Sequence, residues 1–135
     1  MQRVLFIAMT FILLTFACKK EEEFGNPRLL YNKSKNYTYR NISSRSTDDT
    51  TRIGFIALPN VKSYGKLSAF TLVWKKPSGE QSYLKYKNLE NYRYIYDTII
   101  VTKEAGTHTF LAKVSDENDK SIEKKITVKY IKPTN

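Results

Sequence analysis

The sequence lacks most of the residues on which metal sites, disulfides and nucleophilic catalysis depend. Its 135 residues include one cysteine and one histidine. A single cysteine forms no intrachain disulfide, and one histidine without a cysteine cluster makes no zinc-type ligand set. The sequence contains no glycine-rich phosphate-binding loop, and its carboxylates are too scattered to place as a catalytic pair. We therefore predict that the chain is not an enzyme and holds no metal or cofactor.

Glycine and proline are also scarce, at five and four residues, which excludes a collagen-like or low-complexity chain. Acidic residues are outnumbered, because 23 Lys and Arg stand against 13 Asp and Glu, a formal net charge of +10 at pH 7. This balance predicts attraction to anionic glycans or lipid headgroups. Ten tyrosines and seven phenylalanines favour a β-rich domain.

The N-terminus has the features of a secretory signal. Arg3 gives a positive start, residues 4–17 form a nearly unbroken apolar run of 14 residues, and the small residue Ala17 precedes Cys18. The run is shorter than the roughly 20 residues that a membrane-spanning helix needs. These features predict a signal peptide over residues 1–17.

A cysteine directly after a small residue, followed by the charged run 19–23, resembles a bacterial lipoprotein signal. The resemblance implies that Cys18 becomes the mature N-terminus and carries diacylglycerol and an N-acyl chain such as palmitate. More than one acyl chain makes membrane attachment stable. The run 19–23 is similar to the tag that directs some lipoproteins to the exterior of the outer membrane. A cleaved signal with a chance cysteine, an uncut signal anchor and a periplasm-facing position are the alternatives.

The remainder reads as a tether and one domain. Residues 18–31 contain charges, Gly25 and Pro27 and are expected to form a flexible tether, whereas 32–135 suffice for one domain with its own core. Loops are expected at 43–51 and 88–91. Strands are expected at 35–41, 52–58, 67–75, 82–87, 92–101, 107–115 and 121–130. A helix is the alternative at 92–101, but its aromatic and β-branched content favours a strand. About seven such strands predict an all-β sandwich.

The last hairpin carries a second resemblance. Residues 106–116, a polar turn and Ile126-Thr127-Val128 resemble the final hairpin of bacterial immunoglobulin-like and PKD-type domains. Trp74 matches the core tryptophan of their third strand, and His108 stands where these domains often have a tyrosine. The resemblance implies an immunoglobulin-like β-sandwich but no particular activity, because such sandwiches host adhesion, glycan binding and plain spacing alike. We expect His108 to be a packed strand residue and Trp74 a core anchor.

Two surfaces are candidates for ligand binding. If the β-branched residues of 92–101 face the core, a row of tyrosines lines the outside of that strand: Tyr92, Tyr94 and Tyr96. Alternation along three other strands places lysines on one outer sheet face: Lys75, Lys113, Lys125 and Lys129. The strand with Lys85 and Lys87 is expected to extend the edge of that sheet. Cross-strand packing is the alternative for the tyrosines, and solubility with edge protection is the alternative for the lysines.

Two weaker signals concern short motifs. Asp116, Glu117 and Asp119 offer oxygen ligands of the kind that calcium prefers, but a hairpin turn explains the same residues without a metal. Thr50 and Thr98 each follow an aspartate, as in some bacterial O-glycan attachment sites, although such short matches arise by chance. At residues 116–120 we expect a hairpin turn and no calcium site.

The sequence as a whole favours a lipoprotein of the outer membrane that faces the cell exterior and carries a non-enzymatic binding or adhesion module. Its expected partners are the membrane, through Cys18, and a glycan or an outer-membrane protein. Nucleic acid is not expected, because an exported and anchored protein rarely meets it. The alternative is a structural accessory lipoprotein of an outer-membrane transport or assembly complex.

Overall fold

The computed structural model describes residues 25–62 and 65–133, so the predicted signal peptide and Cys18 lie outside the described residues. The described chain forms eight strands. These are β1 (Arg28–Tyr31), β2 (Ile42–Ser46), β3 (Thr51–Leu58), β4 (Leu67–Lys75), β5 (Gln81–Asn91), β6 (Tyr94–Ile100), β7 (Gly106–Asp116) and β8 (Ser121–Ile131). No helix in either described range is long and apolar enough to span a membrane.

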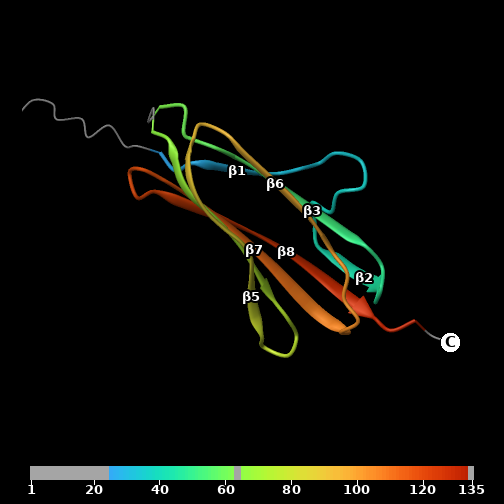
Figure 1. Cartoon of the computed structure of the whole chain (residues 1–135). Coiled ribbons are helices and arrows are strands. Elements are labelled where there is room, and N and C mark those ends of the chain that lie inside the picture. The colour runs from blue at the N-terminus through green and yellow to red at the C-terminus, as the bar shows by residue number, and fades with distance from the viewer. Residues whose placement is uncertain (1–24, 63–64, 134–135) are drawn as a thin grey trace, which may run out of the picture.

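The strands form two stacked sheets (Figure 1). One sheet has the order β1-β3-β6 and the other has the order β2-β8-β7-β4-β5. The pairings are antiparallel except that β2 runs parallel to β8. This order is that of an immunoglobulin-like sandwich, in which strands A, B and E pack on strands C, F and G. The predicted β-sandwich is confirmed, with eight strands where about seven were expected.

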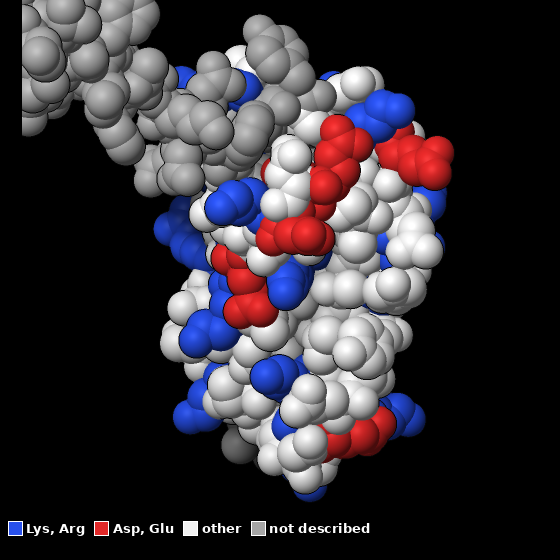
Figure 2. All heavy atoms as spheres, turned by 90° about the vertical axis from the view of Figure 1, so that its left-hand side faces the viewer, with Lys and Arg blue, Asp and Glu red and all other residues white. Residues whose placement is uncertain are grey.

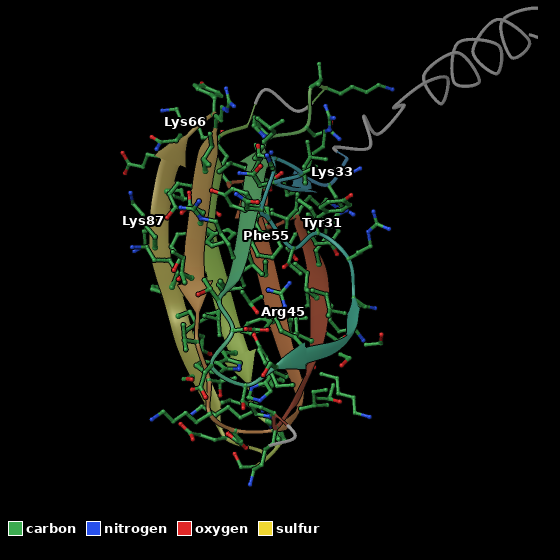
Figure 3. The ribbon with its side chains drawn as sticks, turned by 90° about the vertical axis from the view of Figure 1, so that its right-hand side faces the viewer. Tyr31, Lys33, Arg45, Phe55, Lys66 and Lys87 are labelled. Atoms are coloured by element: carbon green, nitrogen blue, oxygen red, sulfur yellow. The ribbon has the colours of Figure 1, made fainter. Side chains whose placement is uncertain are left out.

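A chain of aromatic rings crosses the core between the two sheets. Tyr31 packs on Phe55 with ring centroids 5.8 Å apart, and Phe55 lies 6.3 Å from Phe70. Phe70 in turn contacts Tyr94 at 5.2 Å and Tyr96 at 5.6 Å. Figure 3 shows Phe55 in the middle of the sandwich and Tyr31 on one side of it. The rings therefore connect the two open sides of the sandwich through its centre.

Trp74 and His108 form a polar link beside these rings. The indole Nε1 of Trp74 donates to Nδ1 of His108 at 2.9 Å, so the second ring nitrogen, Nε2, is the one that donates to the Glu104 carbonyl, also at 2.9 Å. His108 is fully buried, and Trp74 is partly buried and stacks on Phe110. The bond to Glu104 occupies the place of the tyrosine hydrogen bond found at the corresponding corner of immunoglobulin domains. The expectation that His108 is a packed strand residue is confirmed.

The turn at 116–120 uses its acidic residues for backbone geometry. Oδ1 of Asp116 accepts from the backbone N–H groups of Asn118 at 2.9 Å and Lys120 at 3.0 Å. Asp119 adopts a positive φ of 59°, which aspartate tolerates. Among the described residues no three His, Cys, Asp or Glu side chains come together as metal ligands. Turn formation thus accounts for Asp116 and Asp119.

Three expectations for the start of the domain are wrong. Residues 28–31 form β1 and are not tether, because Leu29 and Tyr31 pack into the core. Residues 35–41 are not a strand and cross outside the sandwich. The Tyr37 ring lies so close to Gly54 that a Cβ atom added to this glycine would stand 2.7 Å from the ring. Part of the expected loop at 43–51 is β2. Its sequence is polar and shows no apolar alternation, and its backbone pairs with that of β8.

The expectations for β5 and β6 need correction as well. β5 continues to Asn91 with Leu89 buried, so the break expected at 88–91 does not exist. β6 is a strand, as predicted, but its faces are reversed. Tyr94 and Tyr96 point inward onto Phe70, and Ile95 and Ile99 point outward. The exposed fractions are 49% for Ile95, 54% for Ile99 and 54% for Val101.

Candidate functional site: a lysine face on the five-stranded sheet

Four lysines lie on the outer face of the five-stranded sheet. β4, β7 and β8 are neighbours there, and their inward positions are filled by buried residues such as Phe110, Val114 and Val128. Side chains alternate between the two faces of a strand, so residues next to these point outward. The outward positions include Lys75, Lys113, Lys125 and Lys129.

Two exposed tyrosines extend this surface onto β5. Tyr83 pairs with Val73 and Tyr86 pairs with Thr71, so both rings stand on the same outer face. Their side chains are 74% and 64% exposed. The sequence reasoning missed them because a register shift between Leu72 and Val73 breaks the alternation of β5. We call the surface formed by Lys75, Lys113, Lys125, Lys129, Tyr83 and Tyr86 the lysine face.

The positive charge of the domain is largely unpaired. Within residues 25–62 and 65–133 the structure forms one ion pair, between Lys76 and Glu80 at 2.8 Å, although these ranges hold 20 basic and 10 acidic residues. Glu123 stands opposite Lys113 in the β7–β8 register without pairing with it. On the face that Figure 2 draws, basic side chains are spread over the whole surface, and most of the acidic ones lie in its upper half, several of them beside basic ones. The lysine face therefore keeps its positive charge.

Lys85 and Lys87 do not belong to the lysine face. β5 is the edge strand, as expected, but these two residues pair with the inward-facing Leu72 and Phe70. Their Nζ atoms lie over tyrosine rings of β6, with Lys85 5.9 Å from Tyr96 and Lys87 5.2 Å from Tyr94. Lysines that point inward at an edge strand cover the opening between sheets and discourage edge-to-edge pairing.

The structure does not bring the three predicted tyrosines together as one surface. Tyr92 is exposed, whereas Tyr94 and Tyr96 belong to the interior side of β6. Burial raises the pKa of Tyr94, and the neighbouring Tyr96 raises it further. The row of three tyrosines predicted on this strand is therefore wrong.

Thr98 pairs with the buried Ile53 and faces inward, which does not suit glycan attachment, whereas Thr50 lies exposed in the turn before β3.

Comparisons with known proteins bear on the fold. No protein-family model matches the chain, and no curated protein matches it. A variant of superoxide reductase (neelaredoxin) from Ignicoccus hospitalis shares 8% identity at a TM-score of 0.50, over 82% of this chain and 84% of the reductase. Fibronectin(III)-like modules of Clostridium thermocellum CbhA share 15% identity at a TM-score of 0.45, over 79% of this chain and 47% of that one.

A PKD domain of an M14-like peptidase from a Thermoplasmatales archaeon shares 12% identity at a TM-score of 0.38, over 81% of this chain and 94% of that domain. At 8% identity the reductase alignment shows a shared fold alone. The strand order makes this chain an immunoglobulin-like β domain.

Proposed function

We propose that this chain is a lipoprotein, anchored through Cys18 in the outer membrane and facing the cell exterior, whose domain is a non-enzymatic binding module for anionic glycans, including lipopolysaccharide phosphates. The lysine face is the observation that carries the proposal. It combines four outward lysines with two exposed tyrosines on one sheet.

The chemistry of the lysine face suits an extended polymer better than a single small anion. An exposed contact between a lysine and an anion contributes only about 0–1 kcal/mol. Adjacent strands lie about 4.8 Å apart and same-face residues along a strand about 6.6 Å apart, so one polymer can contact several of these lysines together. Linked contacts of this kind raise the overall affinity without any strong single contact. Tyrosine rings add apolar area with a polar tip, which suits sugar rings.

The test is binding of the lipid-free chain to an anionic polysaccharide at low and high salt. Changing the four lysines of the lysine face to Glu should abolish binding, and wild-type binding should weaken as salt rises, because exposed charges are screened over about 8 Å at physiological ionic strength. A matched control makes the same change of net charge elsewhere, at four exposed lysines outside the lysine face: Lys62, Lys103, Lys120 and Lys132. Equal loss in both variants, or no binding by the wild type, would refute the assignment to this face.

The anchor has a separate test. Cys18→Ala should abolish labelling with a fatty-acid analogue and release the protein from the membrane fraction, since stable attachment depends on its acyl chains. Firm membrane retention of this variant, with normal cleavage after Ala17, would contradict the lipoprotein assignment.

A second function, the accessory lipoprotein, is favoured by the opposite sheet. β6 is an edge strand whose outward side chains Ile95 and Ile99 are about half exposed, with Asp97 between them and no lysine. An exposed edge with more apolar surface than charge is typical of a contact with another protein. A photo-crosslinker at Ile99 that captured one outer-membrane protein in intact cells would favour this function.

A further inference from the structure

A hollow of about 610 Å³ lies on the open side of the sandwich between β1 and β8. It is lined by five residues from three separate segments: Leu30 and Tyr31 of β1, Lys33 and Tyr39 of the connection to β2, and Lys124 of β8. We call it the edge hollow. Figure 3 shows Tyr31 and Lys33 together on this side of the sandwich, with Lys87 on the opposite side.

The hollow exists because β8 is only partly paired on this side. β2 pairs with β8 at residues 128–131, so the first half of β8 has a free edge toward β1. Two side chains cover that edge: the Tyr31 hydroxyl donates to the Lys125 carbonyl at 3.0 Å, and Oδ1 of Asn41 accepts from the Thr127 N–H at 2.9 Å. These bonds tie Tyr31 and the end of the connection 32–41 to β8.

Cations lie over both tyrosine rings. Nζ of Lys124 lies 4.6 Å from the Tyr31 centroid, and Nζ of Lys33 lies 6.0 Å from that of Tyr39. Arg40 stacks on Tyr39 at 4.9 Å and donates to its hydroxyl at 2.7 Å. This hydrogen bond and the charge of Arg40 lower the pKa of Tyr39, and the charge of Lys33 adds to the effect.

Nothing among the described residues neutralises these cations. Neither Lys33, Arg40 nor Lys124 takes part in the one ion pair of the described ranges, and no acidic residue lines the edge hollow. The lining therefore combines the apolar side chain of Leu30 and two aromatic rings with the ammonium groups of Lys33 and Lys124. Sites for small organic molecules are typically about 300–1,000 Å³ and apolar with a few convergent polar groups.

We infer that the edge hollow binds one acidic sugar, a pyranose ring that carries a carboxylate. The ring would lie against the tyrosines and the carboxylate between Lys33 and Lys124, whose ammonium groups can each donate hydrogen bonds to it. Inorganic phosphate would satisfy the charges but leave the aromatic and apolar walls without contact. The acidic sugar belongs to the same class of ligand as the anionic glycans of the proposed function, but its binding in the edge hollow does not depend on the lysine face.

The test uses the full chain in detergent and isothermal titration calorimetry with three probes. Glucuronate supplies ring and charge, glucose the ring alone, and inorganic phosphate the charge alone. Glucuronate should bind at least tenfold more tightly than the other two probes. Absence of glucuronate binding, or equal binding of glucose or phosphate, would overturn the inference.

Substitutions locate the site. Lys33→Ala and Lys124→Ala should each weaken glucuronate binding about tenfold, as expected for the loss of a charge-assisted hydrogen bond. Lys87→Ala is the matched control, because Lys87 also lies over a tyrosine ring, at 5.2 Å, but lines no part of the hollow. Changes to the lysine face should affect polysaccharide binding and leave glucuronate binding unaltered, so the two proposals fail separately. Full affinity in the Lys33/Lys124 double variant would place the sugar elsewhere.

Discussion

The two open sides of the sandwich both carry lysines over tyrosine rings, but in different arrangements. On the β5–β6 side, Lys85 and Lys87 lie over Tyr96 and Tyr94, and both rings pack on the buried Phe70. On the β1–β8 side, lysines again lie over tyrosine rings, but the structure leaves the edge hollow between them. Lysine and tyrosine thus close one side and line a cavity on the other.

The length of the connection explains the difference. β5 and β6 are joined by only Tyr92 and Arg93, so the two edges stay close and the tyrosine rings fill the gap. β1 and β2 are joined by residues 32–41, which follow β3 through hydrogen bonds from Asn32 and Thr38 before crossing to β8. The longer path contacts β8 through Asn41 and leaves the edge hollow beside Lys33 and Tyr39. A binding site can therefore arise from loop length while the lysine–tyrosine pairing stays the same.

Phe70→Ala should have the largest effect, because Phe70 is the ring on which both tyrosines of the β5–β6 side pack. Truncating a buried phenylalanine typically costs about 3–5 kcal/mol. Chemical denaturation should show a loss of this size, which is a large part of the roughly 5–15 kcal/mol that stabilises an ordinary domain. A loss below about 1 kcal/mol would mean that the aromatic chain does not hold the sandwich together.

The next largest effect should distinguish the two sides directly. Tyr96→Ala should lower the free energy of unfolding by about 1.5–3 kcal/mol, because its partly buried ring packs on Phe70. Tyr39→Ala should change it much less, since Tyr39 stacks on the exposed cations Lys33 and Arg40. Denaturation of both variants in parallel checks the contrast. Equal losses would show that the edge hollow is structural in the same way as the opposite side.

Much of the fold follows from the sequence, because the strands that make up the core alternate clearly. β4 matches its predicted bounds, and β3, β7 and β8 lie close to theirs. β1 could not be predicted, since four residues show too little alternation beside a charged segment. β2 could not be predicted either, because it is polar and is held through its backbone to β8.

The error on β6 has a different cause. Both faces of this strand carry large apolar side chains, so the expectation placed the isoleucines inside; the exposed Asp97 between Ile95 and Ile99 is the signal that marks the outward face. At an open side of the sandwich a tyrosine can bury its ring and still place its hydroxyl near the surface, as Tyr96 does toward the Leu84 carbonyl at 3.4 Å. The lysines of the lysine face follow from alternation, whereas Tyr83 and Tyr86 depend on a register shift that only the structure shows.

Alkaline titration should give the smallest effect, with opposite signs on the two sides. Burial raises the pKa of Tyr94, so this tyrosine ionises at a lower pH in the unfolded chain than in the folded protein. The stability that Tyr94 contributes is therefore fully present below about pH 10 and is lost as the pH rises through its folded pKa. Arg40 lowers the pKa of Tyr39, so this tyrosine contributes stability above the unfolded pKa that is lost as the pH falls through the folded one.

Two variants separate these contributions. Tyr94→Phe should flatten the decline of stability above about pH 10. Tyr39→Phe should remove a phenolate that forms below the usual tyrosine pKa of about 10 in an ultraviolet titration of the folded protein. An unchanged titration below that pH in the Tyr39→Phe variant would contradict the arrangement of cations around the edge hollow.

The most direct test of the difference between the two sides is a map of backbone amide shifts during titration with glucuronate. The account predicts concentration-dependent shifts at residues 30–33, Tyr39 and Lys124, with none at Lys87 and Tyr94 on the opposite side. Shifts centred on the β5–β6 side, or no shift around the edge hollow at saturating glucuronate, would contradict it.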